Sequence, residues 1–122
     1  MINWDRVEEL HEEIGPEDFD SVVALFLEEV GQAICRLEEN SSRSNLEADL
    51  HFLKGCALNL GFNSFSLVCQ TGETLVSEGN EELVNLPGLL ATYEDSLNEF
   101  QLELETRLKQ LKRSIPKPSS IG

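Results

Sequence analysis

Apolar residues recur at steps of three and four through most of this chain, and this spacing constrains the fold more than any other feature. Residues three and four positions apart share one face of an α-helix, so each such run predicts an amphipathic helix that buries one side. We expect helices over residues 4–14, from 16 to about 39, from a cap at 44 to 61, from a cap at 63 to a break at 78–80, and over about 86–113. The chain is therefore predicted to be all-α.

The ends of these segments carry residues with known preferences for helix termini. Serine and asparagine cap helix starts, proline is tolerated in a first turn, and glycine ends a helix readily. The residues that set the predicted boundaries are Asn3, Ser44 with Glu47, and Asn63 as caps, Pro16 and Pro87 in first turns, and Gly15 and Gly61 at helix ends. Residues 40–43 are predicted to form a polar turn.

The last helix carries the longest apolar stripe. A coiled coil or a dimer seam would produce the same stripe, but only about three and a half heptads are available and three other amphipathic helices need a partner. We therefore expect an antiparallel up-and-down four-helix bundle, with the short N-terminal helix across one end, in a monomer. The stripe consists of Leu86, Leu90, Tyr93, Leu97, Phe100, Leu104, Leu108 and Leu111.

The chain is strongly acidic and its charge is unevenly distributed. It has 23 acidic and 9 basic residues, for a net charge of −14. Every acidic residue precedes Arg107, whereas residues 107–122 contain five basic residues and no acid. An acidic body repels nucleic acid and anionic membranes, and this basic end is too small to reverse that. We expect neither as a partner.

No apolar run is long enough to span a bilayer, and the N-terminus lacks the pattern of a signal peptide. We expect a soluble, cytoplasmic protein with one domain over residues 1–113 and a disordered tail over 114–122. The start at Met1 and the patternless tail favour a free-standing protein, with an excised domain of a larger kinase as the alternative.

Three cysteines, Cys35, Cys56 and Cys69, lie at uneven spacing within helical apolar patterns. No Cys-x-x-Cys or Cys/His ligand spacing is present, so we interpret them as small, reduced core residues and expect no metal site. A Gly-rich nucleotide loop is also absent, which argues against a kinase or hydrolase.

The most specific segment runs from His51 to Gly61. On a helical projection His51 lies roughly 140° from the apolar face that begins at Leu46, so its side chain is predicted to point outward. Lys54 would place an ammonium one turn away on one flank of His51, and Gly55 would leave the other flank bare. Glycine inside a helix costs about 1 kcal/mol relative to alanine, so access to the histidine is the simplest reason for it. An exposed imidazole beside a cation suits phosphoryl transfer.

This segment resembles the signature of histidine-containing phosphotransfer (HPt) domains, four-helix modules of phosphorelays. The signature is a histidine, Leu-Lys-Gly at the second to fourth positions after it, and Leu-Gly at the ninth and tenth. Every position is matched, by His51, Leu53, Lys54, Gly55, Leu60 and Gly61.

The resemblance continues along the following helix, where the family shows a bulky apolar residue, a cysteine or similar, and then Glu or Gln. Phe65, Cys69 and Glu73 stand at those offsets. Two positions depart from the pattern. Cys56 replaces a serine or alanine, and Gly72 replaces a common leucine and weakens the prediction for its helix.

The resemblance implies that His51 accepts a phosphoryl group through Nε2 from the aspartate of a response-regulator receiver domain and passes it to another receiver. A hybrid sensor histidine kinase would stand upstream. The receiver would supply Mg²⁺, so this chain would need no cofactor of its own and would act as a carrier, not an enzyme. Lys54 would favour the phosphorylated state.

Two further residues receive roles on this interpretation. Glu73 would accept a hydrogen bond from His51 Nδ1 and leave Nε2 free for attack. Leu58 lies two turns beyond His51 on nearly the same face and is assigned to an apolar docking patch. Two alternatives stay open: a phosphorylation-silent helical adaptor that binds receivers or other helical proteins, and a dimeric phosphotransferase.

Overall fold

The computed structural model describes residues 2–39 and 45–114, with side chains as far as residue 109. Over these residues the chain is all-helical, as predicted, apart from an isolated bridge between Ile2 and Phe62. The elements are α1 (Trp4–Ile14), α2 (Phe19–Glu39), α3 (Leu46–Leu60), α4 (Asn63–Ser77), the 3₁₀-helix η1 (Glu81–Leu83) and α5 (Leu86–Ser114). No helix in this part of the chain is long and apolar enough to cross a membrane.

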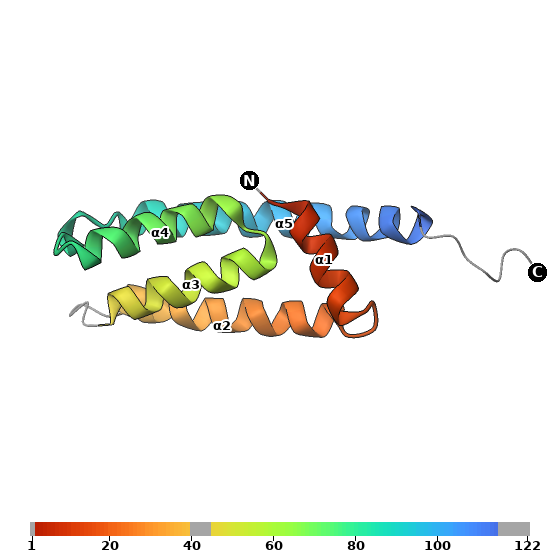
Figure 1. Ribbon diagram of the computed structural model, residues 1–122, viewed down its shortest axis with the longest axis horizontal. Coiled ribbons are helices and arrows are strands. Elements are labelled where there is room, and N and C mark those ends of the chain that lie inside the picture. Colours follow the sequence, from red (N-terminus) through yellow and green to blue (C-terminus); the bar gives the residue numbers. More distant parts are fainter. Residues whose placement is uncertain (1, 40–44, 115–122) are drawn as a thin grey trace, which may run out of the picture.

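The four long helices lie along the length of the molecule, and α1 crosses near the ends of α2, α3 and α4, while α5 continues beyond it (Figure 1). The chain reverses direction between α2 and α3, between α3 and α4, and between α4 and α5. Helix α3 packs most extensively against α4 and also contacts α1 and α2, while α4 packs against η1 and α5. Helix α3 is therefore the element on which most of the fold rests.

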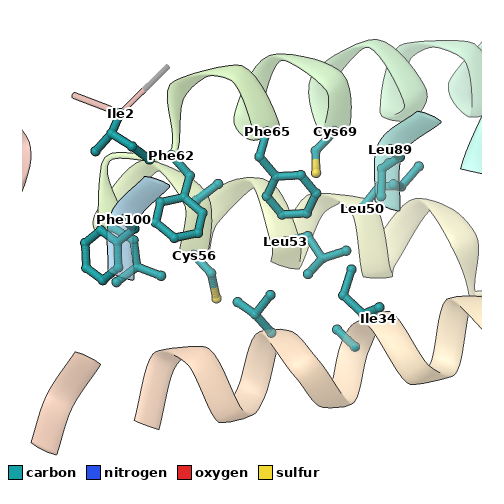
Figure 2. Close-up of a cluster of buried hydrophobic side chains, with 14 of the residues drawn as sticks. Ile2, Ile34, Leu50, Leu53, Cys56, Phe62, Phe65, Cys69, Leu89 and Phe100 are labelled. Carbon is teal, nitrogen blue, oxygen red and sulfur yellow. The ribbon is translucent and has the colours of Figure 1, made fainter. Parts of the chain in front are cut away.

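One face of α3 is buried in the core. Its five predicted core residues are each at most 2% exposed, namely Leu46, Leu50, Leu53, Ala57 and Leu60. Figure 2 shows side chains of α2, α3, α4 and α5 meeting in this cluster, with Phe65 of α4 above Leu53 of α3. Burying a leucine of this kind contributes about 2 kcal/mol. This packing determines which side of α3 is left to solvent.

The turn between α3 and α4 is tight and also receives the N-terminus. Gly61 ends α3 in the left-handed conformation with φ 78°, as predicted, and its N–H donates to carbonyls of the last turn of α3. A β-carbon at this glycine would lie against the Asn3 carbonyl oxygen, whose residue donates its own N–H to the Gly61 carbonyl. Glycine is needed here both for φ and for the close approach of the two backbones.

Several predicted boundaries shift by a few residues. Asn3 caps α1 as expected, with its side chain accepting from the Arg6 N–H. Helix α2 begins at Phe19, not at Pro16, because residues 16–18 form the turn that redirects the chain after Gly15. Asn63 is the first residue of α4 and not its cap, because the Phe62 carbonyl already accepts the Ser66 N–H.

The start of α3 and the two ends of α5 complete the comparison with the predicted boundaries. Ser44 and the turn at 40–43 lie outside the described residues, and Asn45 precedes α3 without a side-chain cap. Helix α5 includes Ser114, which was assigned to the tail, and residues 115–122 lie outside the described residues. Asn85 caps α5 by accepting from the Gly88 N–H, and Pro87 occupies the first turn as predicted.

The cysteines divide into two environments. Cys56 and Cys69 are buried, as predicted, but Cys35 is exposed. The prediction for Cys35 was wrong. Ile34 and Leu37 are buried on the core face of α2, and Cys35 lies on the face of the helix that is exposed to solvent. None of the three forms a disulfide.

Candidate functional site

His51 stands on the outward face of α3. Its neighbours Leu50 and Leu53 are fully buried, so the helical geometry directs His51 away from the core. The side chain is 70% exposed. The imidazole is thus reachable by another macromolecule, as the sequence predicted.

Glu73 of α4 faces His51 of α3. Its Oε2 lies 2.9 Å from His51 Nδ1. The Lys54 ammonium and, after it, the contact with His51 lower the pKa of Glu73, and they outweigh a desolvation that raises it. Glu73 is therefore ionised near neutral pH and can only accept a hydrogen bond, so Nδ1 carries the proton. In neutral His51 this leaves the Nε2 lone pair free.

Lys54 lies one turn after His51 and contacts the same carboxylate. Its Nζ lies 2.9 Å from Glu73 Oε1, and its side chain is only 21% exposed. The sequence placed this ammonium beside the imidazole. In the structure Glu73 lies between the two side chains. Its Oε1 faces the Lys54 ammonium and its Oε2 faces the His51 imidazole.

Gly55 and Gly72 are both helical glycines, but their surroundings differ. A β-carbon on Gly55 would meet no heavy atom within 4 Å, so this surface beside His51 is open. A β-carbon on Gly72 would lie 3.1 Å from Leu50 Cδ1 in the core. Gly72 therefore lets α3 and α4 approach each other, and α4 continues through it.

The remaining predicted site residue, Leu58, lies outside the core. Its side chain is 52% exposed on the helix face that also carries His51. Phe52, which the sequence did not single out, is 39% exposed on the same helix. Exposed apolar side chains near a reactive group suit contact with a protein partner.

The structure adds Gln70, which the sequence reasoning missed. Its Oε1 accepts a hydrogen bond of 2.9 Å from Lys54 Nζ. The available signal was its spacing, because Gln70 stands three residues before Glu73 and so shares its face of α4. Cys69, one residue earlier, is not an alternative nucleophile, since burial raises the pKa of its thiol to about 12.

The site is an open surface and not a pocket. A mainly apolar groove between α4, η1 and the start of α5 shares no residue with it. Across the described residues, no group of three or more His, Cys, Asp or Glu side chains is placed to hold a metal ion. The arrangement offers one oriented, exposed nucleophile with a cation nearby.

Comparison with known protein families agrees with an all-helical domain that presents an exposed, oriented histidine. The family model described as Hpt domain matches residues 5–114. The chain therefore belongs to the Hpt domain family. Proteins of this family are phosphocarriers in two-component phosphorelays, not catalysts. No solved structure matches the chain.

Proposed function

We propose that the chain is a histidine phosphotransfer protein that takes a phosphoryl group from a receiver-domain aspartate onto His51 and passes it to another receiver. The observation that carries this proposal is the 2.9 Å contact between His51 Nδ1 and Glu73 Oε2, on an imidazole that is 70% exposed. It orients the ring and leaves Nε2 as the nucleophile. Membership of the Hpt domain family supports the same assignment.

The transfer step follows from these positions. The Nε2 lone pair of neutral His51 forms a bond to phosphorus as the bond between phosphorus and the aspartate oxygen breaks, and the aspartate leaves as a carboxylate. Nδ1 keeps its proton, so the phosphorylated ring gains a positive charge that the ionised Glu73 balances. Lys54 stabilises the phosphoryl oxygens. The receiver supplies Mg²⁺ for its own aspartyl phosphate, and this chain contributes positioning.

The finer features of the proposal concern fold and partners. Helices α2 to α5 form an antiparallel four-helix bundle domain that ends near residue 113, and the chain acts as a cytoplasmic monomer. The open surface beside Gly55 and the exposed Leu58 admit the receiver. A hybrid sensor histidine kinase carries the receiver that donates the phosphoryl group.

The deciding experiment incubates the purified protein with a panel of receiver domains that have been phosphorylated with acetyl phosphate. We expect the phosphoryl group to move to this chain as acid-labile, base-stable phosphohistidine, and we expect no phosphohistidine on His51→Ala. Removing Mg²⁺ with a chelator should stop the transfer. His11→Ala is the matched control, because this second histidine lies on α1 and packs edge-on against Phe19. The proposal would be refuted if His51→Ala accepted a phosphoryl group, or if no receiver transferred one to the parent protein.

A further inference from the structure

The ammonium of Lys54 has two acceptors, and they bind it differently. Gln70 Oε1 accepts a hydrogen bond of 2.9 Å from Nζ. Glu73 Oε1 is equally close, at 2.9 Å, but it is buried and its contact with Nζ is not aligned as a hydrogen bond. The ammonium is therefore held from two sides, by an ion pair with Glu73 Oε1 and by an aligned hydrogen bond to Gln70 Oε1.

The amide of Gln70 is itself held in place. Its Nε2 donates to Thr74 Oγ1 at 3.2 Å, one turn further along α4. The opposite amide orientation would direct an N–H₂ group at the Lys54 ammonium, which has only donors. Lys54 therefore requires the carbonyl oxygen of Gln70 to face it, and the contact with Thr74 is compatible with this orientation.

From these contacts we infer that Gln70 is a positioning residue, which holds the Lys54 ammonium where it can neutralise the phosphoryl group on His51. The inference rests on the proposed function. A lysine side chain has four rotatable bonds, so an ammonium held by Glu73 alone would sample more positions than one that also has the aligned acceptor of Gln70. Because Gln70 is neutral, it holds the cation without adding a negative charge beside the incoming phosphoryl group. Lys54 keeps all its protons, and the bonds made and broken are those of the transfer step.

The test replaces Gln70 with residues that keep or remove the acceptor oxygen. Gln70→Leu removes it, and we expect phosphoryl transfer from a receiver to slow roughly 10- to 150-fold, the range for losing a hydrogen bond to a charged group. Gln70→Glu keeps an oxygen at the same reach but adds a negative charge, so its rate should lie between those of Gln70→Leu and the parent. Gln101→Leu makes the same exchange at an exposed position of α5 and should leave the rate unchanged.

A second background separates positioning from a general effect on the helix. In Lys54→Ala the ammonium is gone, so adding Gln70→Leu should cause no further slowing. An equal further slowing would show that Gln70 acts elsewhere and would overturn the inference. A parental rate in Gln70→Leu, or a Gln70→Glu as slow as Gln70→Leu, would overturn it as well. All rates are measured well below the melting temperature of each variant.

Phosphoramidate distinguishes failure of this inference from failure of the proposed function. It phosphorylates histidine without a receiver, as its P–N bond breaks, ammonia leaves and the Nε2–P bond forms. We expect slower labelling of His51 and a shorter phosphohistidine lifetime in Gln70→Leu. If phosphoramidate labels His51 but no receiver does, the proposed function fails while the role of Gln70 is still measured. If receivers label His51 and both measurements match the parent in Gln70→Leu, only the inference fails.

Discussion

The inward and outward faces of α3 differ in what constrains the residue at each position. The inward face is packed into the core, with Leu50 and Leu53 fully buried. The outward face carries His51, which is 70% exposed, and Gly55, whose surroundings are empty. Packing limits every substitution on the first face, whereas on the second only chemistry and access matter. One helix thus separates the residues that stabilise the fold from those that serve transfer.

The largest expected effect lies on the inward face, at Leu50. Leu50→Ala should lower the free energy of unfolding by about 2 to 5 kcal/mol, because it leaves a cavity between α3 and α4. Leu58→Ala, an exposed leucine of the same helix, should change it by less than about 0.5 kcal/mol. Urea denaturation of both variants makes the comparison, and equal losses would show that the two faces do not differ in packing.

On the outward face, the largest effect after the loss of His51 itself is expected at Lys54. Lys54→Ala should raise the activation free energy of transfer by about 1 to 3 kcal/mol, which is roughly 5- to 150-fold in rate. Its fold should remain intact by circular dichroism. Lys109→Ala, an exposed cation of α5, is the control in the same time course. Unchanged transfer would reduce Lys54 to a structural partner of Glu73.

Gly72 tests the packed side of the comparison on α4. Its missing side chain makes room for Leu50, since an added β-carbon would lie 3.1 Å from Leu50 Cδ1. Gly72→Ala should therefore lower the free energy of unfolding by about 1 to 3 kcal/mol through overpacking. Thermal unfolding measures the change, and a gain in stability would mean that Leu50 can move aside without cost.

Gly55 is the matched glycine on the open side. Gly55→Ala should raise the free energy of unfolding by up to about 1 kcal/mol, because the helix favours alanine and nothing obstructs the added carbon. Gly55→Gln should fold nearly as well but transfer phosphate poorly, since its side chain leans back over His51. A melting curve and a transfer time course on one preparation decide this. Normal transfer by Gly55→Gln would remove the access explanation.

The smallest effect is the pH dependence that Glu73 contributes. Its pKa is lowered from 4.5, first by the Lys54 ammonium and also by His51, so the ionised form stabilises the folded state. This contribution is complete above the unfolded pKa and is lost as the pH falls through the lower folded pKa. The stability difference between the parent and Glu73→Gln should therefore narrow below about pH 4.5. A difference that widens in acid would contradict the stated direction.

Much of the fold follows from local pattern, and the exceptions have tertiary causes. The buried face of α3 was predictable because helical spacing alone puts Leu46, Leu50 and Leu53 on one side. On α5 the apolar stripe did not include Leu89 and Ser96, yet both are buried. Which side of a long amphipathic helix is covered depends on the elements packed against it, here α4 for α5.

By itself, the sequence determined the helical class, the outward direction of His51, and the family to which its motif belongs, since each depends on spacing within one segment. The contact between Glu73 and His51 was expected from the family resemblance and not from spacing, and only the tertiary structure decided that Gln70 holds Lys54. Both contacts join α3 to α4 and depend on how far the two helices approach. The tertiary structure also decided that Gly55 has open surroundings, whereas Gly72 is packed against Leu50. A glycine has no side chain whose character could predict its surroundings, so its role depends on what the fold brings near it.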